Sequence, residues 1–153
     1  MLLSSVNGIF GGRAQANYAA ENTFKDALAH HRIAHGQKAV SIDLGLMVAE
    51  GVVAENDSLL ASMRRIGLLM DVTQEELIAL LDYYCDPNLP LLSDVNAQIM
   101  VGIEMPSAVL AKGIVLHHSI RRPMFRHLFR IIPRTQRPYL RMQMAQSLIE
   151  LRC

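Results

Sequence analysis

The chain has 153 residues, a formal net charge of +1 and a hydrophobic fraction of 51%. This length and composition favour one globular core and argue against an intrinsically disordered chain. Cys85 and Cys153 stand far apart, which excludes a disulfide framework and favours a reduced, cytoplasmic setting. The sequence shows neither a secretory signal nor an apolar run of the roughly 18 to 20 residues that cross a bilayer, so no membrane partner is expected. Cys, His and carboxylate groups lack metal-ligand spacing, so no metal site is expected either.

The first 36 residues predict a strand, a loop and a long helix. Residues 1–5 form an apolar run that ends in two hydroxyl groups and predicts a central parallel strand. The loop glycines follow the spacing G-x-x-G-G, which does not match the G-x-G-x-x-G of a dinucleotide-binding turn. Residues 15–35 predict a helix that ends at Gly36. The expected core stripe of this helix comprises Ala20, Phe24, Ala27, Leu28 and Ala34.

The middle of the chain continues an α/β pattern. Residues 38–44 predict a second parallel strand, which completes a right-handed crossover. Residues 56–66 predict a helix closed by Gly67. Thr73 and Glu76 form a capping-box pattern at the start of another helix over residues 73–85, with Leu77, Leu80, Leu81 and Tyr84 along it. Residues 98–103 predict a final strand at the edge of the sheet.

Three polar side chains are candidates for chemistry at the carboxyl end of the first strand. Ser5 ends that strand, and Tyr18 and Asn22 lie four residues apart, on one face of the next helix. Ligands of α/β proteins bind at the carboxyl ends of the strands. There, one hydroxyl group can hydrogen-bond a carbonyl oxygen while a phenol protonates it. Taken singly, the same residues also fit a loop-capping hydroxyl, a partly buried helix residue and a surface amide.

These residues belong to a longer pattern that resembles a known family. The pattern comprises Ser4-Ser5, Gln15-Ala16-Asn17-Tyr18-Ala19-Ala20, Asn22, Phe24, Asp26-Ala27-Leu28-Ala29, Arg32 and Ser41-Ile42-Asp43-Leu44-Gly45. It is similar to the ketoreductase domains of polyketide synthases, within the short-chain dehydrogenase/reductase superfamily, and to the fungal highly reducing enzymes in particular. The resemblance covers residues 2–130 and weakens after Gly45. It implies a Rossmann-like parallel sheet with flanking helices.

The resemblance also implies roles for particular residues. Tyr18 would donate the proton, Ser5 would bind the carbonyl group and Asn22 would hold a hydrogen-bonded relay. The cofactor would be NADPH, with contacts at Asp43, Gly45 and Met47. Residues 45–54 would form a mobile segment over cofactor and substrate, with Met47, Val48, Val52 and Val53 lining an acyl pocket or forming plain core. The substrate would be a polyketide chain bound to an acyl carrier protein.

The same family places its glycine-rich cofactor turn, its first strands and its catalytic lysine ahead of the position of residue 1. We therefore expect a partial fold, the C-terminal part of a ketoreductase domain joined to the remainder of a synthase polypeptide, and no reductase activity of this chain alone. The alternative is a non-catalytic remnant or a partner-binding module. A smaller departure is Ala14, which stands where the family usually has glycine.

Charge divides the chain near residue 112. Residues 1–112 hold 7 basic and 13 acidic residues, whereas residues 113–153 hold 8 arginines and only Glu150. We interpret residues 1–112 as ketoreductase and residues 113–153 as a helical or irregular basic segment toward a carrier domain. Its apolar residues Phe125, Leu128, Phe129 and Ile132 indicate a docking helix. Nucleic-acid binding is the competing interpretation, but no nucleic-acid motif surrounds the arginines, so no nucleic-acid partner is expected.

Overall fold

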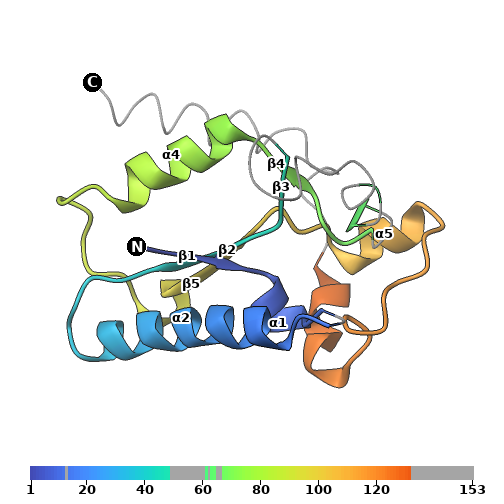
Figure 1. Ribbon diagram of the computed structural model, residues 1–153, viewed down its shortest axis with the longest axis horizontal. Helices are drawn as coiled ribbons and strands as arrows, with labels where there is room; N and C mark the ends of the chain where they lie inside the picture. The colour runs from blue at the N-terminus through green and yellow to red at the C-terminus, as the bar shows by residue number, and fades with distance from the viewer. Residues whose placement is uncertain (13, 49–60, 62, 65–66, 132–153) are drawn as a thin grey trace.

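The fold, taken from a computed structural model, is described for residues 1–12, 14–48, 61, 63–64 and 67–131 (Figure 1). Its centre is a three-stranded parallel sheet in the order β1 (Leu2–Ser5), β2 (Ser41–Leu44) and β5 (Gln98–Val101). The three predicted strands are therefore confirmed, with shorter bounds. The predicted central position of the first strand is wrong for the described sheet. β2 is the central strand and is buried along its whole length, whereas β1 forms an edge.

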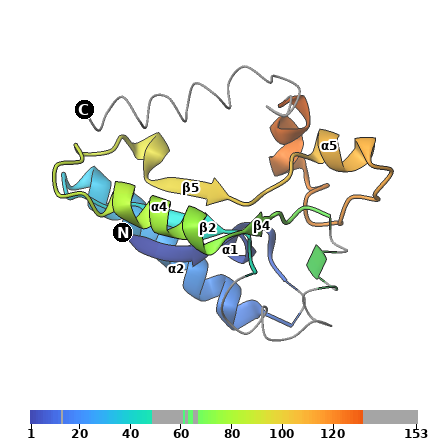
Figure 2. The ribbon, with the colours of Figure 1, turned by 90° about the horizontal axis from the view of Figure 1, so that it is seen from above.

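Two helices cover the two faces of the sheet. In Figure 1, α2 (Ala16–Ala34) lies below the strands and α4 (Gln74–Tyr84) lies above them. Seen from above, α4 runs along the strands (Figure 2). A four-residue helix, α1 (Asn7–Phe10), connects β1 to the segment that leads into α2. The layers are thus helix, sheet and helix, as expected for an α/β protein.

The bounds of α2 agree with the sequence, and its C-terminus shows why. The Gly36 N–H donates to the Ile33 carbonyl at 2.9 Å, and the Gln37 N–H donates to the Arg32 carbonyl at 2.9 Å. Gly36 has a φ of +70°. These bonds satisfy carbonyls that the helix end would otherwise leave unpaired, and they require the left-handed conformation that glycine adopts without strain.

The buried face of α2 differs from the predicted one. Four of the five residues of the expected apolar stripe are exposed, Phe24 at 66%, and Leu28 is half-buried. The buried residues are instead Asn22, Asp26, Ala29 and Ile33. The physical reason lies in the sheet, which presents the buried hydroxyls of Ser4 and Ser41 to this helix. The Ser4 hydroxyl donates to the backbone carbonyl of Asn22, and the Ser41 hydroxyl donates to the side chain of Asp26.

The capping box of α4 is present as predicted. The Thr73 hydroxyl accepts from the Glu76 N–H at 3.2 Å, and the Glu76 carboxylate accepts from the Thr73 N–H at 3.0 Å. One side of the helix, with Leu77 and Leu80, packs against the upper face of the sheet around Ile42. The capping box therefore specifies where the helix starts, and the apolar face specifies which side of it packs on the sheet.

A second, two-stranded parallel sheet was not predicted. It pairs β3 (Leu46–Met47) with β4 (Asp71–Val72). Residues 46–47, expected at the start of a mobile segment, therefore lie in a strand, where the Leu46 N–H donates to the Met70 carbonyl and the Val48 N–H donates to the Val72 carbonyl. The rest of that segment, with Val52 and Val53, and most of the predicted helix over residues 56–66 lie outside the described residues.

Beyond the carboxyl ends of the main strands lie α5 (Pro106–Ala111) and the 3₁₀ helix η2 (Pro123–Arg130) (Figures 1 and 2). A short 3₁₀ helix, η1 (Asp94–Asn96), precedes β5. Phe125 and Leu128 of η2 are buried in one cluster with Val109 of α5 and Phe10 of α1. The Phe10 and Phe125 ring centroids lie 5.1 Å apart. The described part of the basic segment therefore packs on this chain. Its assignment as a separate linker stays a prediction, and Ile132 lies outside the described residues.

No helix among the described residues is long and apolar enough to span a membrane.

Replacing Ala14 tests the backbone of the turn before α2. Ala14 has a φ of +60°, and among the described residues it is the one non-glycine residue with a positive φ. Ala14→Gly should raise the free energy of unfolding by about 0.5–1 kcal/mol, because glycine relieves the left-handed strain. Chemical denaturation measures the change. Ala27→Gly, at an exposed position within α2, is the control and should lower it by about 1 kcal/mol. A destabilising Ala14→Gly would contradict this backbone geometry.

Candidate functional site at the carboxyl end of β1

The two serines that end β1 make different contacts. The buried Ser4 hydroxyl donates to the Asn22 carbonyl of α2 at 3.3 Å. The Ser5 hydroxyl accepts from the Asn7 N–H at 3.3 Å, at the start of α1. This bond uses an acceptor position of Ser5, so the geometry leaves its own O–H group available as a donor. Ser4 thus has a packing role, and Ser5 is the hydroxyl at the open end of the strand.

Tyr18 and Asn22 lie on one face of α2, as predicted, but in different environments. Asn22 is buried at 1% exposure, and its amide donates to the Tyr18 carbonyl at 2.7 Å. Tyr18 is 46% exposed. Tyr18 therefore lies on the same helix face as Asn22, but beyond the part of that face that is buried. The structure brings the helix segment with Tyr18 and Asn22 next to the end of β1, and Asn22 braces the first turn of the helix.

The loop between β1 and α2 is held by contacts that sequence reasoning missed. The Asn7 amide donates to the Gln15 side-chain carbonyl at 2.5 Å, and Thr23 donates to the Gly8 carbonyl at 3.1 Å. A Cβ atom at Gly12 would lie 2.3 Å from the Gln15 side-chain oxygen. Gln15 belongs to the family pattern, but its spacing alone gives no signal of a bond across eight residues.

Asp43 lies in β2 beside Ser4 of β1 and is buried between the sheet and α2. Its carboxyl group is fully buried and accepts from the Gln98 amide at 2.7 Å. Burial is the main cause that raises the pKa of Asp43 to about 6, against the Gln98 hydrogen bond, which lowers it. Ser41 donates to Asp26 at 2.6 Å in the same layer. A cofactor contact at Asp43 stays a prediction, and the structure gives its carboxyl group a place in this buried network.

Gly45 and Met47 follow β2 and lie on the side of the sheet that α4 covers. A Cβ atom at Gly45 would lie 2.2 Å from the Gly102 carbonyl oxygen, so the two backbones cross here without room for a side chain. Met47 is half-buried against the cluster around Ile42 and Val72. Packing alone therefore explains why glycine stands at position 45 and methionine at position 47. That Gly45 and Met47 contact a cofactor stays a prediction.

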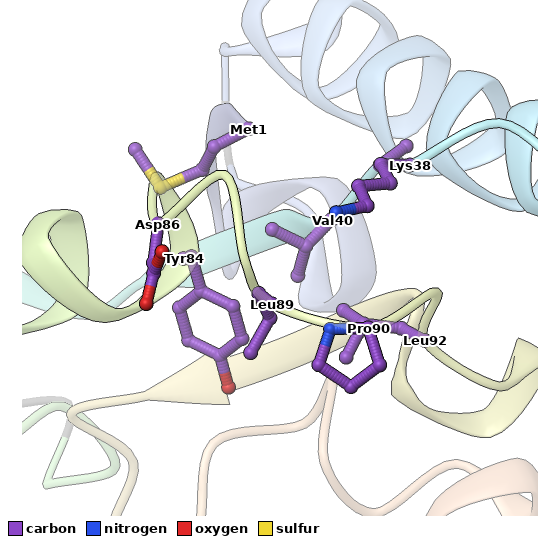
Figure 3. A pocket seen from close by; sticks show the side chains of 9 residues that line it. Met1, Lys38, Val40, Tyr84, Asp86, Leu89, Pro90 and Leu92 are labelled. Carbon is purple, nitrogen blue, oxygen red and sulfur yellow. The ribbon is translucent and has the colours of Figure 1, made fainter.

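A pocket lies at the opposite end of the sheet from Ser5. It is formed where β1 and β2 begin and α4 ends, by Met1, Lys38, Val40, Tyr84, Asp86, Leu89, Pro90 and Leu92, together with Ala39 (Figure 3). Lys38 donates to the Pro87 carbonyl at its rim, at 2.7 Å. Because ligands of open α/β sheets bind at the carboxyl ends of the strands, this pocket is not part of the candidate site. The described residues also contain no group of side chains that could hold a metal ion.

Comparison with known proteins agrees with this geometry. Residues 1–49 match the family model of the KR domain. The chain is 39% identical over 139 residues to highly reducing polyketide synthase 40 of Fusarium mangiferae. This alignment covers 86% of this chain and 6% of the relative. It is 38% identical over 128 residues to reducing polyketide synthase pksF of Alternaria solani, and the alignment covers 84% of this chain and 6% of the relative. It is 47% identical over 95 residues to lovastatin diketide synthase lovF of Aspergillus terreus, and the alignment covers 59% of this chain and 4% of the relative.

The parallel sheet and the match over residues 1–49 define a ketoreductase-type α/β segment. Residues 1–49 belong to the KR domain family, and the chain corresponds to a ketoreductase segment of fungal highly reducing polyketide synthases. The relatives are multidomain synthases, and the chain spans about 6% of the length of the first two. The family consists of reductases that use a nicotinamide cofactor.

The described residues fit the reacting end of such a cofactor and not its phosphates. Tyr18 is exposed and Ser5 stands at the strand end, where a carbonyl group and a nicotinamide ring would meet. At Gly8, other residues of this chain already fill the space. A Cβ atom at Gly8 would lie 3.0 Å from the Thr23 nitrogen and 3.1 Å from the Asn22 Cβ atom. Gly8 therefore allows α1 to approach α2 and leaves no room there for a phosphate group.

Substituting Gly45 tests the backbone crossing beside the site. Gly45→Ala should lower the free energy of unfolding by about 3 kcal/mol, because the added Cβ must displace the Gly102 backbone. Thermal or chemical denaturation measures the loss. Gly113→Ala is the matched control, since a Cβ atom there meets nothing within 4 Å although φ is +73°, and it should cost about 1 kcal/mol. Equal losses in the two variants would argue against the crossing.

Proposed function

We propose that this chain is the portion of an NADPH-dependent β-ketoacyl reductase that supplies the proton donor and the carbonyl-binding hydroxyl. The substrate is a β-keto chain carried on an acyl carrier protein, and the product is the β-hydroxy chain. One observation carries the proposal. Asn22 accepts from the Ser4 hydroxyl of β1 at 3.3 Å through its backbone carbonyl, and Tyr18, one helical turn before Asn22, is 46% exposed.

The chemistry divides between the residues in the following way. NADPH, when bound, supplies the hydride that adds to the carbonyl carbon. Ser5 donates its O–H group to the carbonyl oxygen, while its own oxygen accepts from the Asn7 N–H at 3.3 Å and is thereby oriented. The Tyr18 phenol gives its proton to the oxygen as negative charge develops there. Asn22 holds the Tyr18 carbonyl at 2.7 Å and so fixes the first turn of the helix that carries the phenol.

Tyr18→Phe in a synthase polypeptide that contains this segment tests the proposal. The substitution removes only the hydroxyl group, so reduction of a carrier-bound β-keto substrate should fall by about 10²–10⁴-fold, the usual contribution of general acid catalysis. Formation of the β-hydroxy product is followed by mass spectrometry. Tyr83→Phe, at a 50% exposed tyrosine of α4, is the matched control and should leave turnover unchanged. Full turnover in the Tyr18 variant would refute the assignment.

We infer that the carrier protein approaches along the exposed side of η2. Phe125 and Leu128 point into the core, whereas Arg126, His127 and Arg130 are exposed on the other side of this short helix. The buried Phe125 packs on Phe10, which lies in the helix that follows Ser5. A basic surface next to the candidate site favours an acidic partner, because complementary charge accelerates and orients association.

A double substitution tests this surface. Arg126→Gln with Arg130→Gln should raise KM for the carrier-bound substrate severalfold, mainly at low salt, and leave reduction of a small free β-ketothioester unchanged. Steady-state kinetics at two ionic strengths provide the measurement. Arg32→Gln, at an exposed position of α2, serves as the control. Equal effects on carrier-bound and free substrates would count against carrier docking on η2.

A further inference from the structure

A layer of buried polar side chains separates α2 from the sheet. Ser4 on β1, Ser41 and Asp43 on β2, and Asn22 and Asp26 on α2 are all at most 6% exposed. The register pairs Ser4 with Asp43, and Ser41 lies two residues before Asp43, so these strand side chains project from the same face. Neither the core pattern expected for α2 nor the family roles use Asp26 or Ser41. Asp26 and Ser41 thus have no place in the proposed reaction.

Two carboxyl groups in this layer lack enough donors. Asp26 accepts from the Ser41 hydroxyl through Oδ1 at 2.6 Å. Asp43 accepts from the Gln98 amide through Oδ2 at 2.7 Å, but its Oδ1 is buried without a hydrogen-bond partner. The nearby Ser4 hydroxyl lowers the pKa of Asp43, but its single proton points to the Asn22 carbonyl at 3.3 Å. Asp26 interacts with Asp43, both as a charge and as a hydrogen-bonding side chain. Two ionised carboxylates that meet in a buried site would repel each other, and neither could donate to the other.

We propose that Asp43 carries a proton and donates it to the Asp26 carboxylate, so that one carboxyl–carboxylate hydrogen bond holds α2 on β2. The proton gives Asp43 Oδ1 a hydrogen bond and removes one of the two negative charges. Asp26 is the acceptor because the Ser41 hydroxyl already stabilises its charge, and because Asp43 is the more deeply buried of the two, at 0% against 6% exposure. The proposal concerns the folded chain and does not depend on the proposed reaction.

The titratable groups around Asp43 are few. α2 contributes Asp26 and His30, and the pKa of His30 is raised, first by its hydrogen bond to Asp94 of η1 and less by Gln98 and Asp26. At the positions paired with Asp43, β1 contributes Ser4 and β5 contributes Met100, neither of which titrates. α4 lies on the opposite face of the sheet (Figure 1). Asp26 is therefore the one acidic group that meets Asp43 directly within this layer.

The hydrogen bond should be pH-dependent in a defined direction. The pKa of Asp43 is raised in the folded protein, from 3.8 to about 6, chiefly by burial. A raised pKa means that the folded state holds the proton more tightly than the unfolded state. The stabilisation from this group is therefore complete below the unfolded pKa of 3.8 and is lost as the pH rises through about 6.

Asp43→Asn tests the proposal, because an asparagine amide can donate to Asp26 and accept from Gln98 at every pH. The measurement is the unfolding equilibrium constant of the 153-residue chain in denaturant between pH 4 and pH 8. The ratio of the wild-type constant to the Asp43→Asn constant should grow on the order of 100-fold over this range. Asp82→Asn, an exposed aspartate of α4, is the matched control, and its ratio should stay flat.

A second measurement uses the wild-type chain and does not depend on a variant that folds. Carbon-13 NMR of the aspartate side-chain carboxyl groups should show one that titrates near pH 6, and through-bond correlation assigns this signal to Asp43. A flat stability ratio for Asp43→Asn, or an Asp43 carboxyl group that is fully ionised at pH 5, would overturn the proposal. A chain without a cooperative unfolding transition would also contradict it, because the buried layer would then not exist.

Discussion

The orientation of α2 depends on the polar layer beneath it. Buried hydroxyl and carboxyl groups destabilise a fold unless they form hydrogen bonds, and the strands present Ser4, Ser41 and Asp43 to this helix. The Ser4 hydroxyl donates to the Asn22 backbone carbonyl, and the Ser41 hydroxyl donates to the Asp26 carboxylate, so the face of α2 with Asn22 and Asp26 lies on the sheet. Phe24 lies outside this face and is 66% exposed. The interface between α2 and the sheet therefore contains hydrogen bonds where the sequence predicted an apolar stripe.

The same constraint places the candidate proton donor. Tyr18, Asn22, Asp26, Ala29 and Ile33 follow one another at steps of three or four residues, so they form a single stripe along α2. Four of them are buried against the sheet, and Tyr18 lies one turn beyond, where it is 46% exposed. The tyrosine is thus held by the packing of the rest of its stripe, while its phenol stays open. The packing interface thus ends at the candidate proton donor and fixes the helix that carries it, while Tyr18 stays 46% exposed.

The sequence predicted local features better than the contacts between distant segments. Thr73 and Glu76 specify a helix start, and Gly36 specifies a helix end, because the bonds involved join near neighbours. Ser5, Tyr18 and Asn22 could be proposed from the spacing together with a family resemblance. Asp26 and Ser41 were missed as partners because neither looks unusual within its own element, and only the register of α2 on β2 brings them together.

Two other features needed the folded chain. The pairing of β3 with β4 joins segments of two residues each, too short for a pattern in the sequence. Gly45 was expected at a cofactor and is explained by the approach of Gly102, a contact across more than 50 residues. In each case the missing information was long-range geometry, which periodicity and composition do not contain. The family resemblance identified positions such as Gly45, but only the structure shows which contacts these residues make.

The central claim is that Tyr18 and Ser5 meet a substrate carbonyl group beyond the end of β1. The most direct measurement is a crystal structure of the ketoreductase region of a synthase that contains this segment, with NADP⁺ and an unreactive β-ketothioester analogue bound. The account predicts that the Tyr18 phenol and the Ser5 hydroxyl both lie within about 2.6–3.2 Å of the carbonyl oxygen. A carbonyl oxygen bound by other donors, with the Tyr18 side chain directed to solvent, would contradict it.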